Sequence, residues 1–388
     1  MIRRVRPNYL NEEIILKTKK ETPYKYEDLY FNRGSSALKF LVSTIKEYYN
    51  KKEIIICIQS FNCPTVAQAL LEIEGVKILL ADVKIEDVSI SLEYLKNTKF
   101  KIDILLLLHY QGMINHEYTE IVNHCKVNNI ILIEDLAHVN ECKHKLFGDF
   151  GIYSYAFDKP FTCMQGGKIV INNNSHLVTK LRSCYELLPI ESAKKSKNDI
   201  RTLYLLYKFS SEKYYNRYVD LLVSVPSFIV FLPDKIVYYL FCNKIYNIFN
   251  AILKKLYNIK TKKNNFVCAR LQPCKVLLIE AQKRHFLKLS DIIEYRTLKI
   301  IGVLNQKGKN VYLDKNQNRV SFLNNDSKNP ISKEIEHGCC NWPKALHSLF
   351  KDNCNVILGN TYLNTEFLTQ KLINLPVWSD SIFTKLND

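Results

Sequence analysis

Two charged residues in the first half of the chain, Asp135 and Lys159, stand at or near the ends of largely apolar segments. His138 follows the carboxylate by three positions, and Ser154 precedes the lysine by five. A carboxylate at the end of a buried strand needs a cation or hydrogen-bond donors to stay ionised. A lysine near such a carboxylate and a phosphate-binding turn can act as a Schiff-base nucleophile. The alternatives are a helix cap for Asp135 and a solvated charge for Lys159.

A second group of residues, Gly34, Ser35 and Ser36, precedes an apolar helix-like segment. The start of a helix offers free backbone N–H groups and a partial positive charge, and the serines add hydroxyls. This combination suits a phosphate, although a serine at this place is also an ordinary N-cap.

These residues depend on an alternating pattern of strands and helices. Short apolar runs rich in Ile, Leu and Val predict strands at 53–59, 76–82, 102–109, 130–135, 152–157 and 168–171. Helical spacing fits residues 36–49, 65–74 and 117–128. The alternation indicates an α/β domain with a mostly parallel sheet covered by helices, and ligands of such sheets bind beyond the carboxyl ends of the strands.

Taken in order, five stretches resemble motifs of the DegT family of pyridoxal-phosphate-dependent sugar aminotransferases. They are NRGSSALKFL at 32–41, HYQG at 109–112, IEDLAH at 133–138, GDFGIYSY at 148–155 with Lys159 and Gly166-Gly167 behind it, and NLPV at 374–377. The resemblance implies the type I fold of pyridoxal-phosphate-dependent transferases. In that fold a large domain with a mostly parallel sheet is followed by a smaller C-terminal α+β domain.

The resemblance also implies roles at the site. Lys159 would hold pyridoxal 5'-phosphate covalently and carry the proton, and Asp135 would bind the pyridine nitrogen and keep it protonated. His138 would lie near the ring face or its phenolic oxygen. The phosphate would be bound by Ser154 together with the turn formed by Gly34, Ser35 and Ser36.

Two places depart from the family pattern. Where many relatives have an aromatic residue that stacks on the cofactor ring, this chain has Cys63, with Phe61 as the nearby substitute. Where the neighbouring subunit of some relatives contributes a Gly-x-Asn-x-Arg segment to the phosphate, residues 266–270 keep Arg270 but lack the asparagine.

The predicted reaction transfers an amino group from glutamate to a nucleotide-linked keto-sugar. The product would be used in surface polysaccharide or lipopolysaccharide biosynthesis. A dehydratase branch resembles the aminotransferases but has histidine in place of the Schiff-base lysine, so Lys159 favours transamination. Two alternatives are a family member at a membrane surface, acting in a lipid-linked glycan pathway, and a non-catalytic relative used for assembly or regulation. The resemblance further implies a homodimer.

The composition of the chain bears on its domain organisation and its partners. The 388 residues carry a net charge of +17, and most of the excess lies in residues 181–300. We predict a large domain at 1–180, a basic, apolar helical insertion or linker at 181–265, and a small domain at 266–388. Within the insertion, 219–257 is either an amphipathic helix packed on protein or a basic helix on an anionic membrane. No recognition motif supports nucleic acid as a partner.

The 12 cysteines lack paired Cys-x-x-Cys spacing, and no secretory signal is recognisable at the start of the sequence. We therefore expect reduced thiols, no metal site and a cytoplasmic protein. In the alternative with a membrane-bound helix, the protein is peripheral at the inner face of the membrane.

Overall fold

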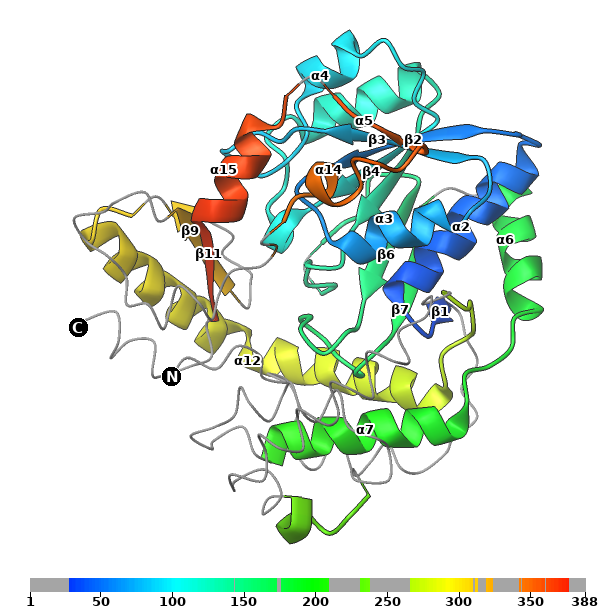
Figure 1. Cartoon of the computed structure of the whole chain (residues 1–388). Coiled ribbons are helices and arrows are strands. Elements are labelled where there is room, and N and C mark those ends of the chain that lie inside the picture. The colour runs from blue at the N-terminus through cyan, green and yellow to red at the C-terminus, as the bar shows by residue number, and fades with distance from the viewer. Residues whose placement is uncertain are drawn as a thin grey trace.

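The structure is a computed structural model. It describes residues 28–142, 144–172, 176–208, 231–237, 266–309, 311–312, 319–323, 342, 344–359 and 361–376. In this part of the chain an eight-stranded sheet forms the centre, and a second, three-stranded sheet lies beside it (Figure 1).

The large sheet has the strand order β1-β7-β6-β5-β4-β2-β3-β10. Its strands are β1 (Leu29–Phe31), β2 (Ile54–Gln59), β3 (Val76–Ala81), β4 (Ile104–Leu108), β5 (Ile131–Asp135), β6 (Phe150–Ser154), β7 (Gly167–Ile171) and β10 (Val356–Ile357). Neighbours from β10 to β6 pair in parallel, whereas β7 pairs antiparallel with both β6 and β1. The predicted α/β class with a mostly parallel sheet is confirmed.

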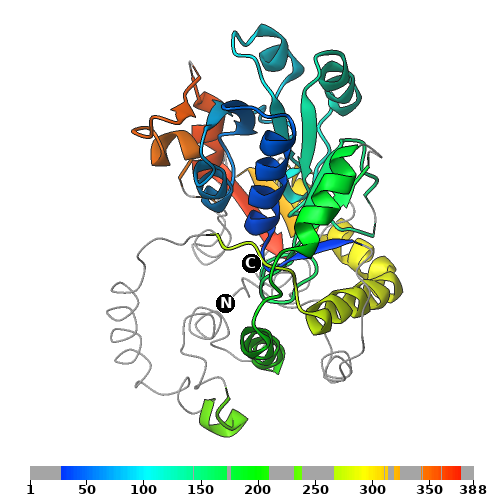
Figure 2. The same ribbon diagram turned by 90° about the vertical axis from the view of Figure 1, so that its right-hand side faces the viewer.

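Helices cover both faces of this sheet because its strands are apolar on both sides. On one face pack α2 (Gly34–Tyr48), α3 (Pro64–Leu71) and α6 (His176–Glu186). Figure 2 shows α2 and α6 side by side. The other face is covered by α5 (Tyr118–Val127) and by α4 (Leu92–Asn97), a short helix that the sequence pattern did not predict.

The strand predicted at 152–157 is wrong in its bounds, since β6 ends at Ser154. Tyr155 is buried in a core cluster, and residues 155–166 form a connection that turns the chain back into β7. Apolar residues beyond the strand fill that cluster, so hydrophobicity alone extends the strand too far. Lys159 therefore lies in this connection and not at a strand end.

The second sheet has the order β11-β9-β8 and is antiparallel. It consists of β8 (Val311–Tyr312), β9 (Arg319–Leu323) and β11 (Leu372–Pro376). The 34-residue helix α12 (Pro273–Gln306) packs against it and, nearer its start, against α7 (Ala193–Lys208). Two short helices, α14 (Leu346–Leu349) and α15 (Leu363–Lys371), lie along the C-terminal segment that supplies β10 to the large sheet.

Most of the segment 219–257 lies outside the described residues, which include only 231–237 of it. Here Val237 is buried in the cluster formed with α7 and α12, while Phe231 and Ile236 are exposed. Asp234 pairs with Arg201 and Lys208 of α7. Among the described residues there is no helix with the length and hydropathy needed to cross a membrane.

Candidate active site

The start of α2 lies against the end of β6 at the carboxyl edge of the parallel strands. A Cβ atom built on Gly34 would lie 3.1 Å from the Cβ atom of Ser154. A Cβ atom on Gly167 would lie 2.5 Å from the carbonyl oxygen of Arg33. Gly167 is therefore needed for the close approach of helix and strands, and a side chain on Gly34 would crowd that of Ser154.

This helix terminus is open to an anion. Arg33 is its N-cap and makes no side-chain capping hydrogen bond, and the first turn contains no acidic residue. Ser35 and Ser154 are both half-buried. Ser36 differs, because it is buried and its hydroxyl donates to the carbonyl of Val267 at 3.3 Å. Of the three predicted phosphate-binding serines, Ser36 thus has its hydroxyl engaged by protein.

Asp135 ends β5 and is buried. Its Oδ1 atom accepts the backbone N–H of Ala137 at 3.0 Å. Burial raises the pKa of this carboxyl, while the Ala137 N–H and the charge of Lys159 act in the opposite direction. The structure thus brings the predicted carboxylate and lysine into one electrostatic environment.

Lys159 is placed by the turn that follows β6. Its backbone N–H donates to the carbonyl of Ala156 at 3.1 Å, and its ammonium lies 3.4 Å from a carboxylate oxygen of Asp158. The side chain is 13% exposed, so the amine is shielded without being sealed from a ligand.

His138 belongs to an aromatic cluster at the same edge. Its Nδ1 atom accepts the backbone N–H of Gln111 at 3.3 Å, which places the proton of a neutral ring on Nε2. The Trp342 ring is stacked on it, with centroids 5.4 Å apart and planes at 19°. Phe61 and Tyr110 complete the cluster by edge contacts with Trp342.

The sequence around Trp342, residues 338–343, fits either a substrate entrance or a buried turn. No sequence pattern predicts the contact of its ring with His138. Of the two candidates for the ring-stacking position, Phe61 is in the cluster, while Cys63 is the N-cap of α3 and contacts Thr65.

Buried donors without partners test whether the site suits pyridoxal phosphate. Asn62 Nδ2 and Gln111 Nε2 have no hydrogen-bond partner within the described part of the chain. Such atoms are costly unless a ligand or water satisfies them. With the open helix terminus, the buried carboxylate and the lysine, they fit a phosphorylated aromatic aldehyde.

The segment 266–270, expected from the partner subunit in some relatives, lies against its own chain here. Asn32 donates its backbone N–H to the carbonyl of Ala269 at 2.9 Å and its side-chain N–H to that of Val267 at 3.0 Å. The guanidinium of Arg270 is paired with Glu186 at 2.7 Å.

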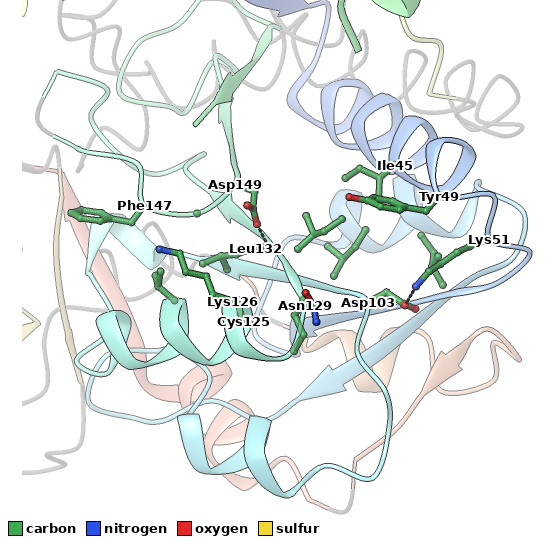
Figure 3. A pocket seen from close by; sticks show the side chains of 16 residues that line it. Ile45, Tyr49, Lys51, Asp103, Cys125, Lys126, Asn129, Leu132, Phe147 and Asp149 are labelled. Carbon is green, nitrogen blue, oxygen red and sulfur yellow. Dashed lines mark hydrogen bonds and ion pairs between the residues drawn. The ribbon is translucent and has the colours of Figure 1, made fainter. Parts of the chain in front are cut away.

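A separate cavity of about 340 Å³ lies at the opposite, amino edge of the strands (Figure 3). Its two aspartates already accept backbone N–H groups: Asp103 that of Ile55 at 2.8 Å and Asp149 that of Leu132 at 2.9 Å. These two carboxylates fix the starts of strands. Because the cavity lies at the edge of the sheet opposite Asp135 and Lys159, it is not part of their site.

Comparison with known proteins agrees with the geometry. Residues 28–200 match the model of the DegT/DnrJ/EryC1/StrS aminotransferase family. The resemblance inferred from the motifs is thereby confirmed for this part of the chain, which contains Asp135, Ser154 and Lys159.

One curated relative is the UDP-4-amino-4,6-dideoxy-N-acetyl-beta-L-altrosamine transaminase of Campylobacter jejuni subsp. jejuni serotype O:23/36 (strain 81-176). It is 31% identical over 140 residues, which are 34% of this chain and 36% of the relative. The match thus spans about a third of that relative's length.

Solved structures resemble the whole chain. Helicobacter pylori PseC, an aminotransferase involved in the biosynthesis of pseudoaminic acid, has a TM-score of 0.65 at 15% identity, over 99% of this chain and 96% of its own. Escherichia coli GDP-4-keto-6-deoxy-D-mannose-3-dehydratase with bound hydrated PLP has a TM-score of 0.62 at 14% identity, over 100% and 99%. The fold is therefore that of these enzymes.

Proposed function

We propose that the chain is a pyridoxal-phosphate-dependent aminotransferase that transfers an amino group from glutamate to a nucleotide-linked keto-sugar. The observation that carries this proposal is the buried carboxylate of Asp135 at the carboxyl edge of the sheet, with Lys159 near enough for its charge to act on that carboxyl. The uncapped start of α2 beside Ser154 supports it.

Each residue has a task that follows from its surroundings. When bound, the cofactor supplies an electron-withdrawing ring. Asp135 would accept the N–H of the ring nitrogen, so that the buried carboxylate gains a cationic partner. Lys159 would hold the cofactor covalently and then, as a free amine, take and return the proton at the substrate carbon.

Binding is divided between the two ends of the cofactor. The first turn of α2, with the hydroxyls of Ser35 and Ser154, would hold the phosphate by backbone N–H donation and the helix dipole. His138, whose Nε2–H is a donor, would lie at the ring or its phenolic oxygen, backed by Trp342. Asn62 and Gln111 would supply further donors.

The substrate class rests on the relatives. One relative is named as a transaminase of a UDP-linked amino sugar, and PseC is named for pseudoaminic acid biosynthesis. A lysine at position 159, where the resembling dehydratases have histidine, favours transamination over dehydration. We further propose that the enzyme acts as a homodimer and contributes to surface polysaccharide or lipopolysaccharide biosynthesis.

Two variants test the activity. Lys159→Ala should abolish transfer of the amino group from glutamate to a panel of UDP- and GDP-linked keto-sugars, because it removes the amine that would hold the cofactor and carry the proton. Asp135→Asn should retain the fold and lose most of the rate, since an amide does not keep the ring nitrogen protonated. Full transfer by Lys159→Ala would refute the proposal, and so would wild-type protein that binds no pyridoxal phosphate.

A further inference from the structure

Three ligand-type side chains converge in the core behind the candidate active site. His109 follows β4, Glu134 lies on β5, and His144 comes from the connection between β5 and β6. The Nε2 atoms of the two histidines lie 2.9 and 2.8 Å from the same carboxylate oxygen, Oε2 of Glu134. We propose that these three residues bind a divalent metal ion, Zn²⁺ by their chemistry.

The distances suit one ion. Nitrogen and oxygen ligands bind Zn²⁺ at about 2.0–2.2 Å, so two ligand atoms of one ion stand about 3.0–3.5 Å apart. The three atoms of this cluster all lie within 4.8 Å of one another. For the ion to fit, the two Nε2–Oε2 distances of 2.9 and 2.8 Å would lengthen by a few tenths of an ångström. Two histidines and a glutamate form one of the usual protein ligand sets for Zn²⁺.

The second oxygen of Glu134 is held by backbone hydrogen bonds, as the carboxylate ligands of metal ions usually are. Oε1 accepts the backbone N–H groups of Phe147 and Gly148 at 2.9 and 2.6 Å, which fixes the carboxylate with Oε2 toward the histidines. Glu134 is fully buried, and a buried carboxylate needs a countercharge that a divalent ion would supply.

An independent observation is the hydroxyl of Tyr118. This side chain is 9% exposed, its ring contacts that of His109 edge-on at 5.3 Å, and it lies beside Glu134. Its buried oxygen makes no hydrogen bond of good geometry to any described residue. It is placed to bind a water on the ion or to act as a fourth ligand.

The site is distinct from the one that holds Asp135 and Lys159. Consecutive strand residues point to opposite faces, so Glu134 faces α5 while Asp135 faces α2. The connection that carries His144 is exposed at Lys145 and Phe147, which gives the ion a short path from solvent. The ion would join this connection to the ends of two central strands.

Zinc stoichiometry of the full-length protein tests the proposal. After incubation with excess Zn²⁺ and gel filtration, elemental analysis should find about one equivalent per chain, and Zn²⁺ should raise the Tm. Co²⁺ in its place should give the visible absorption of a low-symmetry, four- or five-coordinate ion. Wild-type protein that holds no Zn²⁺ and shows no Tm shift would overturn the proposal, leaving a cluster of hydrogen bonds.

Variants locate the ion. His144→Ala should weaken Zn²⁺ binding by at least about 100-fold, whereas His124→Ala, a half-buried histidine of the neighbouring helix α5, should not. Circular dichroism checks that both variants are folded. Should His144→Ala fail to fold, His144→Gln replaces it. Equal affinity of the His144 variant and the wild type would assign any bound zinc to other residues and refute the site.

Discussion

The substitution Gly167→Ala tests whether the start of α2 is held against the sheet as described. An added Cβ would lie 2.5 Å from the carbonyl oxygen of Arg33 and 2.6 Å from the Cα atom of Gly34. These are backbone atoms and cannot rotate away. Because an ordinary contact needs at least 3.4 Å, β7 and the helix start must separate by close to an ångström.

The expected effect has two parts. Overpacking of this kind costs about 1–3 kcal/mol of folding free energy. The same displacement moves the N–H groups of the first turn away from Ser154, and each 1.4 kcal/mol lost there weakens binding about tenfold. We therefore expect a lower Tm and a dissociation constant for pyridoxal phosphate raised about tenfold or more.

Absorbance titration with pyridoxal phosphate and thermal unfolding measure these two effects. Gly302→Ala is the matched control, since its Cβ in α12 would have no atom within 4 Å and should stabilise the helix by up to about 1 kcal/mol. If Gly167→Ala keeps both the Tm and the cofactor affinity of the wild type, the described approach of helix and sheet is wrong.

Two further predictions concern stability. Glu141→Gln should lower the free energy of unfolding by about 1.5–3 kcal/mol, because it removes the carboxylate that Lys168 and Lys283 share at 2.6 and 2.7 Å. The two ammonium groups keep their second partners, Asp28 and Glu280. The two lysines hold the pKa of Glu141 below its usual value, so the stability that this carboxylate contributes is present at neutral pH and is lost as the pH falls below about 4.5. Chemical denaturation from pH 7 to pH 3 should therefore show a smaller decline in the free energy of unfolding for the variant than for the wild type. An equal decline for both proteins would contradict this role. Trp342→Ala removes ring contacts with Phe61, Tyr110 and His138, which contribute about 0.5–1.5 kcal/mol each. The Tm should therefore fall, and Trp342→Phe should recover part of the loss. A Tm of Trp342→Ala equal to that of the wild type would show that the cluster adds no stability.

The parallel strands could be predicted because each is a short apolar run buried on both faces. For β2 to β5, the predicted and observed bounds differ by at most two residues at either end. The antiparallel return of β7 could not be predicted in the same way, because pairing direction leaves no mark on hydrophobicity. The short helix α4 was missed since six residues carry too little periodicity.

Some residues of the candidate site could be predicted from the sequence, and others could not. Asp135 and Ser154 could be found because the ends of neighbouring strands meet at one edge. Lys159 lies in the connection after β6, and the motif that places it five residues after Ser154 identified it. Trp342 and His144 could not be found, because their positions depend on packing between segments that are distant in sequence or on the path of a connection. Ser36 was assigned to the phosphate by its place in the turn, but the carbonyl of Val267, which the chain brings back 231 residues later, accepts its hydroxyl.

Covalent trapping of the cofactor tests the central proposal most directly. The purified protein is incubated with pyridoxal phosphate, reduced with borohydride, digested and analysed by mass spectrometry. We expect one modified lysine, Lys159, and loss of the modification when Lys159 is replaced by alanine. Absence of any modification, or modification of another lysine with Lys159 untouched, would contradict the assignment of the site and of the function built on it.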